Sequence, residues 1–232
     1  MMARNATLLG SAFALFAALA LPACAEEQPK MIPTAQVDEA KPAKSGSETA
    51  VLSGGCFWGM QGVFEHVKGV TQVLSGYAGG GRTTAEYETV STGSTGHAET
   101  VKITFDPHEV SYGELLRIYF SVAHDPTELN YQGPDEGTQY RSNIWYANDT
   151  QKKVAEAYIK QLGAAHVFSA PIVTRVDPLT GFFPAEAYHQ DYLIHNPNQP
   201  YIVYNDLPKI EALKRVYAGY YRDTPVMVHT PS

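Results

Sequence analysis

Apolar residues recur at two distinct spacings along the chain, and these spacings predict its secondary structure. Over residues 98–105 they alternate with polar residues, which is the period of a strand with one buried face. Residues 60–67 instead carry Met, Val, Phe and Val at i, i+3, i+4 and i+7, which is the spacing of a helix face. Further strands are predicted at 49–53, 70–77, 87–91, 143–146 and 172–176, and further helices from Ser111, over 150–162 and over 207–217.

The order of these elements indicates the fold class. Strands and helices interleave, but some strands follow one another directly, which favours a mixed sheet with helices packed on it over a doubly wound parallel sheet. The chain is therefore predicted to be α/β (α+β). The stretch 124–142 is rich in turn residues, and loops of that length in compact domains usually carry function.

The first residues have the composition of an export signal. Arg4 supplies a positive charge, residues 6–21 are almost wholly apolar, and residues 23–25 read Ala-Cys-Ala, the small residues that a signal peptidase recognises. We expect residues 1–25 to be a signal peptide that directs the protein to the bacterial periplasm. Two alternatives stay open: a lipoprotein signal of residues 1–23, with the protein lipid-anchored through Cys24, and an uncleaved anchor.

One domain is expected after this signal. Residues 26–48 contain three prolines and no apolar periodicity, which predicts a flexible linker. A short arm packed on the domain is the alternative interpretation. The domain itself is predicted to span residues 49–222, and residues 223–232 form a C-terminal tail.

Composition excludes several classes of function. Seventeen Lys and Arg stand against twenty-four Asp and Glu, and this net charge of -7 does not provide the basic surface that a nucleic-acid-binding protein needs. Two cysteines are too few for a disulfide scaffold, and no paired Cys/His spacing indicates structural zinc. Cleavage by signal peptidase would remove Cys24 and the lipoprotein route would lipidate it, so either route would leave Cys56 as the single thiol.

Cys56 is predicted to lie where a Gly-Gly turn leads into a helix. The unpaired amides and the dipole of a helix start favour a negative charge, so we expect a lowered thiol pKa and a larger thiolate fraction. Phe57 and Trp58 follow at once and place two aromatic side chains beside the sulfur. We interpret Cys56 as a reactive thiol, with an inert buried cysteine as the alternative.

Glu99 is the second candidate for chemistry. By alternation it shares a strand face with Val101, Ile103 and Phe105. If that face is the core face, desolvation raises the carboxyl pKa, so that Glu99 holds a proton near neutral pH and can donate it. The alternative is a glutamate at a strand end whose carboxyl group reaches water.

Three histidines offer a different chemistry for Cys56. His97, His124 or His189 could pair with the thiol as in cysteine hydrolases. Their positions in the sequence do not choose among them, and each also fits a structural role.

Four separated segments resemble one family. Gly55 to Gly59 reads GCFWG, the signature of the A-type peptide-methionine sulfoxide reductases. Segments 96–99 (GHAE), 131–142 (YQGPDEGTQYRS) and 185–192 (AEAYHQDY) are similar to further segments of that family, in the same order. The resemblance runs from about residue 49 to about residue 205 and identifies residues 49–222 as a catalytic domain.

The resemblance implies catalytic roles for five matching residues. Cys56 would attack the sulfoxide sulfur and become a sulfenic acid, and Glu99 would protonate the sulfoxide oxygen. Tyr87 and Tyr140 match the tyrosines whose hydroxyl groups hold that oxygen. Asp135 matches a carboxylate of the nearby loop.

Phe57 and Trp58 match the apolar wall that receives the substrate methyl group. The resemblance also implies selectivity for the S epimer and no metal or organic cofactor. The substrates would be oxidised proteins or peptides and free methionine sulfoxide. The family's fold is a two-layer mixed-sheet plait with a ferredoxin-like core and extensions.

The chain departs from many members of the family near its C-terminus. They carry resolving cysteines there, whereas residues 201–232 contain none. We therefore expect regeneration by an external thiol, either a thioredoxin-like protein or a small thiol. A monomer is the default expectation for the oligomeric state. Two other functions stay open: a hydrolase or acyltransferase that uses Cys56 with His97 or His189, and a non-enzymatic module that binds oxidised methionine through Phe57 and Trp58.

Overall fold

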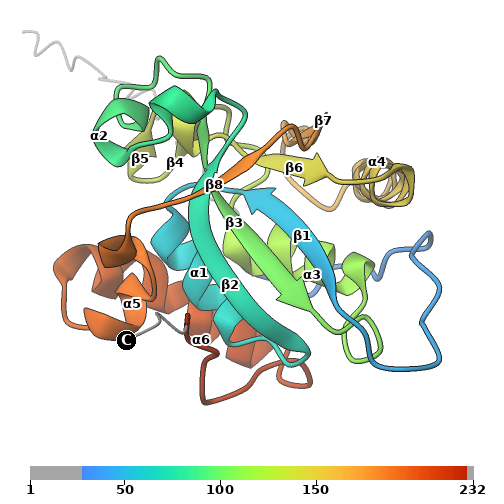
Figure 1. Ribbon diagram of the computed structural model, residues 1–232. Coiled ribbons are helices and arrows are strands. Elements are labelled where there is room, and N and C mark those ends of the chain that lie inside the picture. The colour runs from blue at the N-terminus through green and yellow to red at the C-terminus, as the bar shows by residue number, and fades with distance from the viewer. Residues whose placement is uncertain (1–27, 229–232) are drawn as a thin grey trace, which may run out of the picture.

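The alternating segment predicted from the sequence lies in the middle of the sheet. The computed structural model describes residues 28–228, and in it a curled six-stranded sheet has the order β7-β6-β1-β3-β2-β8 (Figure 1). Neighbouring strands are antiparallel except β6 and β7, which are parallel. The strands are β1 (Glu48–Ser53), β2 (Val70–Ala78), β3 (Ala98–Phe105), β6 (Asn143–Tyr146), β7 (Arg175–Pro178) and β8 (Phe182–Pro184).

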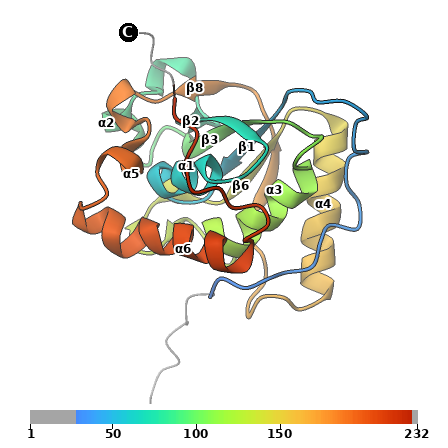
Figure 2. The ribbon, with the colours of Figure 1, turned by 90° about the horizontal axis from the view of Figure 1, so that it is seen from below.

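The helices gather mainly on one face of this sheet. Figure 1 shows α1, α3 and α6 together behind β1, β2 and β3, and Figure 2 shows α4 beside α3. The predicted mixed sheet with packed helices is confirmed, whereas the two-layer plait stays a prediction. The helices are α1 (Phe57–Glu65), α2 (Tyr87–Val90), α3 (Tyr112–Ile118), α4 (Asp149–Ala164), α5 (Tyr192–His195) and α6 (Leu207–Val216).

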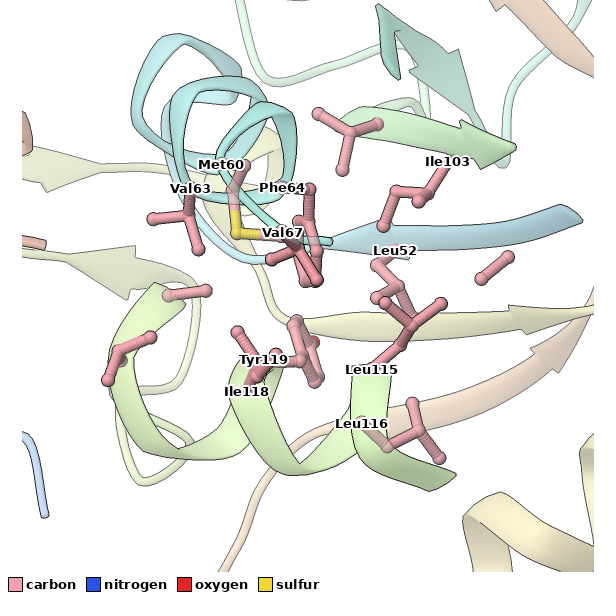
Figure 3. Close-up of a cluster of buried hydrophobic side chains, with 14 of the residues drawn as sticks. Leu52, Met60, Val63, Phe64, Val67, Ile103, Leu115, Leu116, Ile118 and Tyr119 are labelled. Atoms are coloured by element: carbon pink, nitrogen blue, oxygen red, sulfur yellow. The ribbon is translucent and has the colours of Figure 1, made fainter. Parts of the chain in front are cut away.

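The main core lies between the sheet and these helices. Val101 and Ile103 of β3 are fully buried, as their alternation predicted. Figure 3 shows the apolar face of α1 pointing toward α3 and toward Leu52 of β1. Ser111 caps α3 by accepting a hydrogen bond from the Glu114 amide at 3.2 Å, so the predicted helix start is confirmed. This core holds α1 rigidly against β3.

Residues 87–91 form a helix, not the predicted strand. Tyr87–Val90 is α2, and the Glu86 carbonyl accepts hydrogen bonds from the Thr89 and Val90 amides. The Glu186 carboxylate, from a distant segment, accepts a hydrogen bond from the Tyr87 amide at 2.9 Å and so satisfies a free amide at this helix start. The strand predicted at 172–176 begins later, at Arg175.

The segment before β1 lies against the domain. Ile32 is 2% exposed, its carbonyl accepts a hydrogen bond from Arg117 Nε at 2.7 Å, and the Pro33 carbonyl accepts one from the Tyr158 hydroxyl. Residues 28–47 thus form an arm that runs past α4 (Figure 2), which differs from the flexible linker expected for 26–48. The cause is one apolar anchor with backbone hydrogen bonds, which composition does not reveal.

The remaining predictions at the termini fall largely beyond the described residues. The signal peptide of residues 1–25 and Cys24 lie outside them. Within residues 28–228 no helix combines the length and apolarity needed to cross a membrane.

Because the arm packs on the domain, substitutions at two neighbouring arm residues should differ in their effect on the free energy of unfolding. Ile32→Ala should lower the free energy of unfolding by about 2–4 kcal/mol, because it removes a buried apolar side chain. Met31→Ala is the matched control, since Met31 is 67% exposed, and should change it by less than about 0.5 kcal/mol. Urea denaturation of the chain from residue 26 measures both; equal effects would mean that the arm does not pack in solution.

Candidate active site

The nucleophile is placed by a sharp turn between β1 and α1. Gly55 has φ +89, in the left-handed region that favours glycine. A Cβ at this position would also lie 2.7 Å from Gln132 Cβ. Cys56 follows as the N-cap residue of α1 and is 8% exposed. The thiol thus lies at the helix start, as predicted, but is almost buried.

Glu99 meets this helix start from the sheet. It is the second residue of β3 and is 3% exposed. Its Oε2 accepts a hydrogen bond from the Phe57 amide at 2.9 Å, one of the amides that a helix start leaves without an intrahelical partner. The alternative of a carboxyl group in open water does not apply to Glu99.

A small cavity collects the predicted site residues. It has a volume of about 190 Å³. The start of α1 and the first residues of β3 form one side of the cavity. The elements α2, β4 (Tyr131–Gln132) and β5 (Asp135–Glu136) lie beyond the end at which β3 begins (Figure 1). The cavity is lined by the seven residues that the family resemblance assigned to the site and by one that it did not: Cys56, Phe57, Trp58, Tyr87, Glu99, Asp135, Tyr140 and Tyr201.

Asp135 is held by the residue that sequence reasoning missed. The Tyr201 hydroxyl donates a hydrogen bond to Asp135 Oδ2. Tyr201 lies outside the four segments that resemble the family, so no motif indicated it. The two side chains join the long loop to the C-terminal part of the chain at the cavity.

Contacts with neighbouring side chains hold the two wall residues, Phe57 and Trp58, in place. Trp58 Nε1 donates a hydrogen bond to His189 Nδ1 at 3.1 Å, and its ring stacks on Tyr192 with centroids 3.8 Å apart. Phe57 lies 5.9 Å from the Tyr77 ring, centroid to centroid. The 185–192 segment therefore supports the wall and does not line the cavity.

Burial sets the protonation states of the titratable side chains in the site. Desolvation raises the pKa of Glu99 to about 8, although the Phe57 amide opposes the shift. At neutral pH Glu99 therefore carries a proton, as predicted. Burial also raises the pKa of Tyr87 and of Tyr140, with the negative charge of Glu99 the next cause, so both hydroxyl groups are donors.

The pKa of Cys56 moves opposite to the expectation. Burial raises it well above its ordinary value, and the charges of Glu99 and Asp206 raise it further. The Trp58 amide at the helix start lowers it, as expected of a helix N-terminus, but this effect is smaller. The thiol form therefore prevails, first because the sulfur is buried and then because the negative charges of three carboxyl groups oppose a thiolate: Glu99, Asp206 and Asp135.

The candidate histidines have other partners. The His97 ring contacts the Gly80 amide and the Gly81 carbonyl, and His124 Nδ1 contacts the Tyr119 carbonyl. His189 Nδ1 accepts the hydrogen bond from Trp58. The geometry thus does not pair Cys56 with a histidine base.

Comparison with known proteins assigns the site to a family. Residues 48–220 match the family described as "Peptide methionine sulfoxide reductase". The chain belongs to this family. It is 60% identical over 190 residues to "Peptide methionine sulfoxide reductase MsrA 2" of Mesorhizobium japonicum, covering 82% of this chain and 97% of that protein. It is 48% identical over 186 residues to "Peptide methionine sulfoxide reductase MsrA 2" of Synechocystis sp., covering 80% and 87%.

Two solved structures are similar to the reductase chain. "Methionine sulfoxide reductase A of Corynebacterium diphtheriae" matches with a TM-score of 0.57 and 35% identity, covering 68% of this chain and 78% of that one. Mxr1 from Saccharomyces cerevisiae in reduced form matches with a TM-score of 0.59 and 31% identity, covering 71% and 92%. Both likenesses agree with the family assignment.

The described residues of this reductase do not form a candidate metal site. Among residues 28–228, no group of three or more His, Cys, Asp or Glu side chains is placed to hold a metal ion. The expectation that no cofactor is needed stays a prediction. The chemistry that the arrangement supports is nucleophilic attack by sulfur beside a protonated carboxyl group.

Proposed function

We propose that the chain reduces methionine S-sulfoxide to methionine with Cys56 as the nucleophile and Glu99 as the proton donor. Its activity is that of the peptide methionine sulfoxide reductase family, to which it belongs. One observation carries the assignment of roles: the thiol, the proton-holding carboxyl group and two tyrosine hydroxyl groups converge on one small cavity.

The reaction begins when Cys56 Sγ gives an electron pair to the sulfoxide sulfur. Glu99 delivers its proton to the sulfoxide oxygen, so that the sulfur–oxygen bond can break. The protonated oxygen passes to Sγ as the newly formed sulfur–sulfur bond breaks and its electron pair returns to the methionine sulfur. The proton that the thiol released restores Glu99. The sum is one sulfoxide and one thiol converted to one thioether and one sulfenic acid.

The hydroxyl groups of Tyr87 and Tyr140 hold the sulfoxide oxygen as its negative charge develops. Both line the cavity, and their raised pKa values keep them as donors. Asp135, held by Tyr201, faces the same cavity from the loop. Phe57 and Trp58 receive the methyl group. Selectivity for the S epimer is proposed on the family membership of the chain.

An external thiol regenerates Cys56. No cysteine follows Cys56 in the sequence, so one thiol condenses with the sulfenic acid to a disulfide and water, and a second thiol releases Cys56. The reductant is proposed to be a thioredoxin-like protein or a small thiol. The substrates are oxidised proteins or peptides and free methionine sulfoxide, handled by a monomer with a ferredoxin-like plait at its core.

Turnover should depend on a dithiol and on Cys56. The chain from residue 26 should reduce a methionine-S-sulfoxide peptide with dithiothreitol and stop after one equivalent without it, and Cys56→Ser should be inactive. Glu99→Gln should lose on the order of 10²–10⁴-fold in kcat/KM. Because the acid form of Glu99 is needed, kcat/KM should fall as pH rises through about 8, and Glu99→Gln should lack this decline.

The two alternatives make different predictions in the same assay. Thiol-independent cleavage of esters or amides would indicate a hydrolase. Binding of the sulfoxide peptide that survives Cys56→Ser, with no methionine formed by the unmodified protein, would indicate a binding module.

The protein is proposed to be exported to the bacterial periplasm. The support is the pattern of residues 1–25: one positive charge, an apolar run and small residues at 23–25. Protein recovered from the periplasm of a bacterial host should begin at Glu26 after signal peptidase cleavage, or at a lipidated Cys24. Terminal sequencing by mass spectrometry distinguishes these outcomes, and a cytoplasmic protein that begins at Met1 or Met2 would contradict export.

A further inference from the structure

Asp206 is a buried carboxylate that the proposed reaction does not use. Its side chain is 0% exposed. Lys209 Nζ lies 3.5 Å from Oδ1 as an ion-pair partner, and otherwise neither carboxylate oxygen has a hydrogen-bond partner among residues 28–228. A buried charge with such sparse compensation is costly. A native structure that keeps one calls for a reason other than packing.

Capping of a helix start does not explain Asp206. The segment before α6, Ile202–Asp206, is already helical, and Asp206 itself has helical backbone angles (φ -108, ψ -43). The first turn of α6 therefore continues an existing helix and needs no side-chain cap. The Asp206 carboxylate makes no capping hydrogen bond.

Asp206 points at the first turn of α1. A Cβ built on Gly59 would overlap Asp206 Oδ1 and lie 2.8 Å from its Cγ. The carboxylate thus occupies the notch left by the missing side chain of Gly59, three residues after Cys56. The last glycine of the GCFWG segment is the residue that admits this charge.

The negative charge of Asp206 acts electrostatically on the sulfur of Cys56. After burial and Glu99, Asp206 is the next cause that raises the pKa of Cys56. Burial raises the pKa of Asp206 itself to about 6, while Lys209 opposes the shift. Asp206 is therefore ionised at and above neutral pH, under the conditions in which Cys56 would otherwise form a thiolate.

We propose that Asp206 is a positioning residue whose negative charge, seated against Gly59, keeps Cys56 in the thiol form and thereby protects it from peroxides. Hydrogen peroxide transfers one oxygen atom to a thiolate and gives a sulfenic acid and hydroxide, and susceptibility follows thiolate character. Each such event consumes external reductant without repairing a methionine. The proposal rests on the proposed function only in taking Cys56 as the nucleophile.

Other charges face the same region and must be considered in any pH profile. Lys209 of α6 and Asp135 of β5 act on Asp206. Glu99 of β3 and Asp135 act on Cys56. Among these groups Glu99 has a pKa of about 8, so its ionisation is separated from that of Asp206.

The test compares Asp206→Asn with Asp191→Asn and the unmodified protein. Asp191 is also a buried aspartate, 4% exposed, but it accepts hydrogen bonds from the Val228 amide and is not among the charges acting on Cys56. The rate of Cys56 alkylation by iodoacetamide is measured across pH, with folding checked by circular dichroism. This readout requires no reductase turnover, so it is independent of the proposed function.

Asp206→Asn should alkylate at the same rate as the unmodified protein below pH 6, where Asp206 is neutral. Above pH 6 its rate should rise to roughly tenfold that of the unmodified protein, because removal of the charge lowers the thiol pKa and raises the thiolate fraction. Oxidation of Cys56 by hydrogen peroxide should accelerate in parallel, and Asp191→Asn should follow the unmodified protein in both reactions. A ratio that stays constant through pH 6, or an equal change in Asp191→Asn, would overturn the proposal, since either indicates loosened packing and not a lost charge.

Discussion

The hydrogen bond from the Phe57 amide to Glu99 joins the two halves of the active site. It ties the first turn of α1 to the second residue of β3 across 2.9 Å. The bond satisfies an amide that the helix start leaves free, and it sets the acid beside Cys56. Burial and this bond act against each other on Glu99, and burial prevails, so its pKa is about 8. Without this contact the proton donor would not face the nucleophile.

Much of this arrangement follows from the sequence because it depends on local patterns. The alternation in 98–105 places Glu99 on the core face of β3. Gly55 and Ser111 mark the starts of two helices, and the structure has helices that begin just after these positions. Resemblance to the family then selects residues from distant segments, and all of them line one cavity. Pattern and motif are informative wherever one segment alone determines the environment of a side chain.

The remaining features depend on tertiary contacts that no single segment reveals. Tyr87–Val90 is a helix whose first amide donates a hydrogen bond to the carboxylate of Glu186, a residue from a distant segment. Tyr201 and Asp206 reach the site from a C-terminal segment with no recognised motif. The raised pKa of Cys56 has the same origin: the helix start favours a thiolate, but burial and carboxylates from other elements outweigh it.

The most direct test of the account is a single turnover followed by intact mass spectrometry. The chain from residue 26 is mixed with an excess of methionine-S-sulfoxide peptide in the absence of any thiol. The account predicts one methionine formed per protein molecule and a gain of one oxygen atom that maps to Cys56. Methionine formed with Cys56 unmodified, or oxygen found on another residue, would contradict the assignment of Cys56 as the sulfur that receives the oxygen.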